Sequence, residues 1–131
     1  MLGSQWRIQV QNNTGVALAA TDTIEISGQT WTVGSGGLAY GASTVIMPAT
    51  TGNSLASAAF ANGTAQTGNT AFGFKGIINA TISTATPAGN LNFFYQEYDA
   101  TLGWPGNGNG ELVGVMVCTA VGAQTPIQID F

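Results

Sequence analysis

The sequence contains very few charged side chains and no histidine. Charged residues make up 6% of the chain, against about 25% in ordinary globular domains. Two basic residues cannot neutralise a row of phosphates, so the composition excludes nucleic-acid binding. The absence of histidine removes the side chain that most often acts as a general base. The charged residues are Arg7, Lys75, Asp22, Glu25, Glu97, Asp99, Glu111 and Asp130.

Cysteine, long apolar runs and strong helix formers are also scarce. The single cysteine, Cys118, excludes an internal disulfide bond. No apolar run approaches the roughly 18 residues of a membrane span. Residues 1–7 lack the basic and apolar regions of a signal peptide, so we expect none. Because Lys, Arg and Glu are nearly absent, little is available to form the exposed faces of helices.

The residues that are present favour β-structure. Nineteen glycines, with many Asn and Thr residues, supply turns and strands. Trp6, Ile8 and Val10 alternate with polar residues, which predicts a strand with one buried face. Similar alternating segments recur along the chain, and turn residues separate one segment from the next. The sequence therefore predicts one all-β domain over residues 1–131, an antiparallel β-sandwich or jelly roll of about eight short strands.

Three segments in the first half carry more detailed expectations. Residues 16–20 are expected to form a return strand after an Asn-rich turn. Gly28 interrupts an alternating pattern, which predicts a hairpin turn at this position. Residues 49–70 are expected to form a loop with one short element at 54–61, which could be a helix or a strand.

The second half shows stronger apolar patterning. In residues 71–86 the even-numbered side chains, Phe72 included, are expected to point inward. The aromatic segment 91–98 is expected to lie centrally or beneath a partner, because aromatic side chains occupy both of its faces. Residues 112–118 are apolar on both faces, which predicts a buried core strand.

Few residues offer catalytic or metal-binding chemistry. Cys118 lies in an apolar run, where a thiol is normally a small core residue. Glu97 and Asp99 could form a carboxylate pair, but a solvated strand end is the commoner arrangement. Asp99 and Glu111, with Asn107 and Asn109, carry oxygen ligands suited to calcium. Their spacing matches no EF-hand and ordinary turn chemistry is the commoner explanation, so we expect no catalytic residues, metal or cofactor.

Trp104 lies beside Pro105 in a loop rich in Gly and Asn. With Tyr98 it could stack on a sugar ring or contact another protein. It could also fold back onto the end of the sandwich. The sequence alone leaves these three alternatives open.

The scarcity of charge has a consequence for the surface. A folded chain of this mass exposes roughly 6,500 Å² of surface, which gives about one charged side chain per 800 Å². One partner contributes about this area to a standard protein interface. We therefore expect a surface that is largely covered by other subunits. A monomer with a neutral polar surface is the alternative. The interface candidates are Trp6, Phe94, Tyr98 and Trp104.

Two features carry a resemblance to a known class of proteins. The first is the pattern formed by residues 89–99, Gly103-Trp104-Pro105 and residues 109–113. The second is the composition, which is rich in Ala, Thr and Gly and poor in Lys. In both, the chain resembles small structural proteins of tailed-bacteriophage virions, in particular capsid decoration (cement) proteins.

The resemblance implies a non-enzymatic homo-oligomer, often a trimer, that binds the major capsid protein or other virion proteins. It implies a location in the virion after synthesis in the host cytoplasm, with neither nucleic acid nor membrane as a partner. A phage tail, baseplate or fibre component is an alternative within the same class. A carbohydrate-binding module for host attachment is the alternative from a different class.

Overall fold

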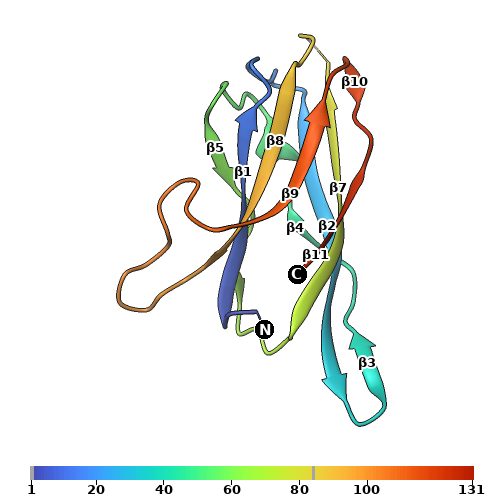
Figure 1. The fold of residues 1–131 in the computed structure, drawn as a ribbon, viewed down its shortest axis with the longest axis vertical. Coiled ribbons are helices and arrows are strands. Elements are labelled where there is room, and N and C mark those ends of the chain that lie inside the picture. Colours follow the sequence, from blue (N-terminus) through green and yellow to red (C-terminus); the bar gives the residue numbers. More distant parts are fainter. Residues whose placement is uncertain (1, 84) are drawn as a thin grey trace.

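Two antiparallel sheets pack face to face as a β-sandwich in the computed structural model, which describes residues 2–83 and 85–131 (Figure 1). This confirms the all-β prediction. No helix in the described residues is long and apolar enough to span a membrane. The first sheet has the order β5 (Phe60–Asn62), β1 (Gln5–Asn13), β8 (Gly89–Glu97) and β9 (Glu111–Cys118), and β6 (Gln66–Thr67) also pairs with β1.

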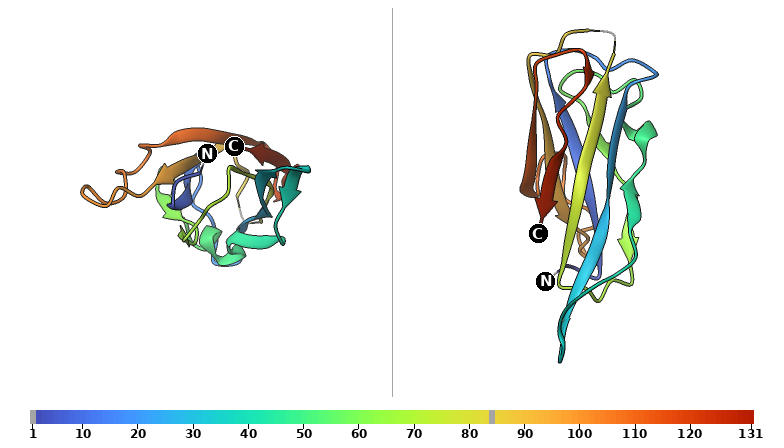
Figure 2. Two further views of the ribbon diagram at one scale, coloured as in Figure 1. Left: turned by 90° about the horizontal axis from the view of Figure 1, so that it is seen from below. Right: turned by 90° about the vertical axis from the view of Figure 1, so that its right-hand side faces the viewer.

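The second sheet faces the first across the core (Figure 2). A 3-10 helix, η1 (Ala49–Gly52), follows β4 (Thr44–Met47), a strand of this sheet. Within the described ranges the structure has eleven strands where about eight were expected, because several pairings are only two to four residues long. The second sheet has the order β10 (Gly122–Ala123), β7 (Gly73–Ile82), β2 (Thr23–Gly34) and β3 (Gly37–Tyr40), while β11 (Ile127–Asp130) pairs with β7 and β4 (Thr44–Met47) with β2.

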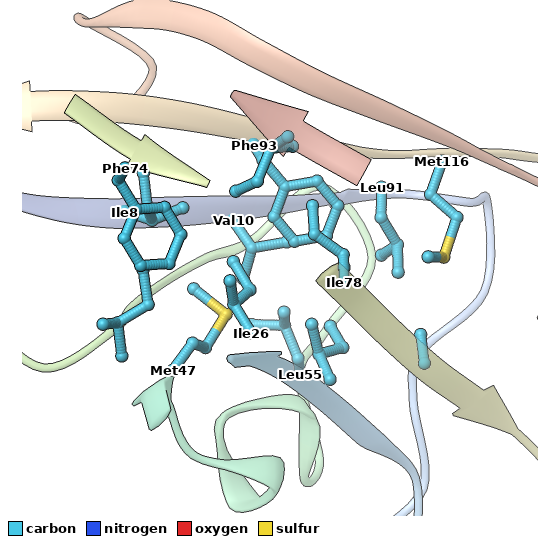
Figure 3. Packing of buried hydrophobic residues seen from close by; sticks show 14 of the residues in the cluster. Ile8, Val10, Ile26, Met47, Leu55, Phe74, Ile78, Leu91, Phe93 and Met116 are labelled. Atoms are coloured by element: carbon cyan, nitrogen blue, oxygen red, sulfur yellow. The ribbon is translucent and has the colours of Figure 1, made fainter. Parts of the chain in front are cut away.

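The core forms where the alternating strands meet (Figure 3). Trp6, Ile8 and Val10 are fully buried, as their spacing in β1 predicts. At one end of the core the rings of Trp6, Phe74, Tyr95 and Phe131 pack together, with centroids 5.2–5.9 Å apart. Aromatic pairs at such separations add stability beyond the area they bury.

The predicted hairpin at Gly28 is wrong, because β2 runs unbroken through this residue. Gly28 lies opposite Gly76 in β7, and both face the ring of Phe74. A Cβ atom on Gly28 would lie 2.6 Å from Cζ of Phe74, and one on Gly76 would lie 2.5 Å from its Cε1. The two glycines therefore make room for a core aromatic ring and do not form a turn.

Residues 16–20 do not form the expected strand, and residues 54–59 form turns that lead into β5. The buried side chain of Asn12 accounts for both, because its Nδ2 donates to the carbonyl oxygens of Val16 (2.8 Å), Leu55 (3.0 Å) and Ala56 (3.1 Å). One amide thereby satisfies backbone groups in two loops, and two backbone hydrogen bonds, from Leu18 N to Leu55 O and from Ser54 N to Ala19 O, join the same loops directly.

Two further segments differ from expectation. Phe72 precedes β7, is 43% exposed and stacks on Trp31 with centroids 6.4 Å apart. Strand β9 lies at the edge of its sheet and exposes one of its faces, so the prediction of a buried core strand is wrong. The prediction for residues 91–98 is confirmed, because β8 lies between β1 and β9.

Candidate interaction surface

The connection between β8 and β9, residues 98–110, projects sideways from the sandwich (Figure 1). Its tip is a tight turn in which Oδ1 of Asp99 accepts hydrogen bonds from the N–H groups of Thr101 (2.7 Å) and Leu102 (2.8 Å). These two donors hold the pKa of Asp99 below its ordinary value. Leu102, at the tip, is 85% exposed. The loop thus presents one large apolar side chain on a hydrogen-bonded turn.

Trp104 folds back onto its own chain. The guanidinium carbon of Arg7 lies 4.2 Å from the centroid of the Trp104 ring, which is a cation–π contact. Tyr98 packs against the same ring, with centroids 5.3 Å apart and an interplanar angle of 65°. Because Arg7 covers one face of the ring, the geometry favours a structural role over an open sugar-stacking platform.

Two buried glutamines hold the base of the loop against the sheet. Gln9 and Gln96 have almost no exposed surface, although both belong to the outer face of their strands. Nε2 of Gln96 donates to Oε1 of Gln9 (3.3 Å) and to the carbonyl oxygens of Gly106 (3.1 Å) and Asn109 (3.2 Å). We call this pair of side chains the glutamine clamp.

The remaining bonds of the clamp leave no amide group unpaired. Nε2 of Gln9 donates to Oδ1 of Asn62 and of Asn107, at 2.9 Å each. Its Oε1 also accepts from the N–H of Gly108 (2.8 Å), and Nε of Arg7 donates to Oε1 of Gln96 (3.0 Å). A buried polar network in which every group is paired fixes one local conformation. Alternation places these residues on the outer face but gives no signal that a loop covers them.

The four predicted interface residues do not form one common surface. Trp6 is fully buried in the aromatic end of the core, so its assignment to an interface is wrong. Tyr98 and Trp104 meet at the base of the loop. Phe94 is half-buried on the outer face of β8, where it pairs with Leu112 of β9.

An exposed apolar surface lies on β9, a strand whose sequence predicts a place in the core. Leu112, Val115 and Val117 are each 40–66% exposed, and we call them the β9 face. Among the described strands of its sheet, β9 pairs only with β8. An exposed, apolar edge strand is a ready template for pairing with another chain.

A second apolar surface lies on the hairpin of β2 and β3, which extends beyond the body of the sandwich (Figures 1 and 2). Val33 pairs with Leu38, and Trp31 with Tyr40, so the four side chains share one face of the hairpin, which we call the hairpin face. Val33, Leu38 and Tyr40 are each at least half exposed. A projecting two-stranded hairpin has little stability by itself, which favours contact with a further surface.

The side chains with catalytic or metal-binding potential are the thiol of Cys118 and the carboxylates. Cys118 is fully buried, and burial raises the pKa of its thiol, which keeps it protonated and unreactive at neutral pH. Within residues 2–83 and 85–131, no group of three or more His, Cys, Asp or Glu side chains is arranged to hold a metal ion.

No protein-family model, curated protein or solved structure matches this chain.

Proposed function

We propose that the chain is a non-enzymatic structural subunit that assembles with copies of itself and decorates and stabilises a bacteriophage capsid. The observation that carries self-assembly is the pair of apolar faces, one on an edge strand of each sheet. The resemblance of the sequence to capsid decoration proteins supports the virion setting.

The energetic argument starts from the absence of charge on these faces. Neither the β9 face nor the hairpin face contains an ionisable group other than the hydroxyl of Tyr40. Burying such a face removes apolar area from water, at roughly 25 cal/mol per Å², and desolvates no ions. Large apolar patches of this kind mark interaction sites.

The two faces lie on different strands and consist of different residues, which constrains the assembly. If the hairpin face of one subunit packs on the β9 face of the next, the contact is head-to-tail. Contacts of this kind close into a ring when the rotation between subunits allows it. We propose a ring of three, in keeping with the trimers that the resemblance implies. Repeated copies on a lattice then bind the capsid with avidity.

Light scattering after size-exclusion chromatography tests the assembly. We expect the unmodified chain to run as a trimer, and Val117→Lys and Leu38→Lys to run as monomers, because each introduces a charge into an apolar contact. Asn79→Lys is the control, because it adds the same charge at an exposed position on the central strand β7. A monomer at the highest soluble concentration would overturn self-assembly.

Electron microscopy of purified virions that contain the chain tests the setting. We expect density at regular positions on the capsid lattice. Density confined to the tail or fibre tip would overturn capsid decoration and favour the tail alternative. Loss of binding in both monomeric variants, but not in Asn79→Lys, would link attachment to assembly.

A further inference from the structure

A polar groove lies where the strands β2 and β4 meet the segment 66–71, with a volume of about 320 Å³. This volume falls within the range of small-ligand sites. Its lining consists of hydroxyl and amide groups with a few small residues and no charged side chain. Its polar side chains include those of Thr30, Thr32, Thr44, Gln66 and Asn69, and the ring of Trp6 also lines it.

Trp6 is one of the residues that line this groove, and its side chain carries an unsatisfied donor. Its indole Nε1 is buried and has no hydrogen-bond acceptor anywhere in the part of the chain that the structure describes. The ring otherwise contacts Phe74, Tyr95 and Phe131. An unpaired buried N–H group costs free energy, and a core that needed only apolar volume could use phenylalanine here.

We propose that the groove binds one residue of a neutral carbohydrate, with an oxygen of the sugar accepting the hydrogen bond of Trp6 Nε1. An indole N–H only donates, so the ligand must supply an acceptor. Threonine hydroxyls and amides both donate and accept, which matches the hydroxyl groups of a sugar. The lining holds no cation to neutralise an acidic ligand.

Binding requires a small rearrangement at the mouth of the groove. Trp6 has no exposed surface in the unliganded chain, so a sugar oxygen reaches Nε1 only when the covering segment moves. Residues 67, 68 and 70 are exposed. The segment is held to the N-terminal part of the chain by the pairing of Thr67 with Gln5 and by the bonds of Asn69 to Gly3 and Ser4, so the movement must break or stretch these contacts. This inference is independent of the proposed assembly, because the groove lies within one chain.

The indole N–H signals of the ¹⁵N-labelled chain provide the test. The chain has three tryptophans, so Trp31→Phe and Trp104→Phe identify the signal of Trp6 by elimination. The probes are neutral hexoses, pentoses, deoxyhexoses and N-acetylhexosamines, each added alone. We expect at least one sugar to shift the Trp6 signal and leave that of Trp104 in place.

Variants of the lining complete the test. Thr32→Val removes one hydroxyl from an exposed residue without changing its shape, and we expect it to weaken binding about five-fold. Thr119→Val is the matched control outside the groove and should bind as the unmodified chain does. No shift with any sugar would mean that water alone fills the groove, and this would overturn the proposal. A shift at Trp104 instead, or one produced by inorganic phosphate but not by sugars, would also overturn it.

Discussion

Asp22 is a charged residue that the fold buries completely. Its carboxylate accepts hydrogen bonds from the N–H of Ala19 (2.8 Å) and from the N–H (2.8 Å) and hydroxyl of Ser83. Burial alone would raise the pKa of Asp22, but the bonds from Ser83 and Ala19 outweigh it and hold that pKa below its ordinary value. One carboxylate thereby joins the start of β2 to the end of β7.

Replacing this carboxylate should make the chain less stable and less sensitive to acid. Because the pKa of Asp22 is lower in the folded state, its stabilisation is present above about pH 4 and is lost as the pH falls through the folded pKa. We expect Asp22→Asn to lower the free energy of unfolding by about 1–3 kcal/mol at neutral pH.

Urea unfolding at neutral pH and at about pH 3 measures this effect. The difference between Asp22→Asn and the unmodified chain should shrink at the lower pH. Asp130→Asn is the control, because Asp130 is exposed on β11. An equal loss of stability at both pH values would show that shape, not charge, accounts for the role of Asp22.

At the scale of elements, the loop over residues 98–110 depends on the glutamine clamp. Gln96→Leu would leave Oε1 of Gln9 with one bond fewer and remove the partners of Nε of Arg7 and of two loop carbonyl groups. We expect a loss of about 1–3 kcal/mol in the free energy of unfolding and faster amide exchange within the loop.

Hydrogen exchange read by mass spectrometry distinguishes the two effects. Gln128→Leu is the control, because it makes the same change at an exposed position on β11. Unchanged exchange in residues 98–110 of Gln96→Leu would show that the bonds of Gln9 and the Arg7–Trp104 contact hold the loop without Gln96.

Local patterns predicted those elements whose environment follows from alternation. The strand β1 was predicted because one of its faces is apolar, and β8 because its side chains alternate and both of its faces carry aromatic residues. The edge position of β9 was missed, because alternation describes the faces of a strand and not its pairing neighbours. Gly28 looked like a turn because the ring that needs its space, Phe74, lies far along the chain.

The same limit applies to the candidate surface. Tyr98 and Trp104 are close in sequence, so their meeting at the loop could be anticipated. The partner that covers the ring, Arg7, comes from β1, and no local pattern connects the two. The sequence places Trp6 both on the apolar face of a strand, by its spacing, and among the interface candidates, and its burial shows that the spacing is the better guide.

At the scale of the whole molecule, seven charged side chains are spread over 6463 Å² of accessible surface, because the eighth, Asp22, is buried. The β9 face and the hairpin face each include an edge strand of one sheet, and neither contains any of these charged side chains. If self-assembly buries these faces, the association should depend on apolar area and very little on ion pairs.

Salt therefore provides a further test of the assembly. We expect the dissociation constant of the oligomer to change by less than about three-fold between about 0.05 M and 1 M sodium chloride, because salt screens only charges. Sedimentation velocity at both concentrations measures it. Marked weakening by salt would point to a contact through Arg7 or Lys75 in place of the apolar faces.

The glutamine clamp also determines the conditions under which the loop keeps its form. Primary amides neither gain nor lose protons in water, and a guanidinium stays charged in proteins. The groups that fasten residues 98–110 to the sheet are amides, backbone groups and the guanidinium of Arg7. Acidic and alkaline media should therefore leave the base of the loop in one conformation, whereas the turn that carries Leu102 depends on the carboxylate of Asp99 and should loosen once acid protonates that group.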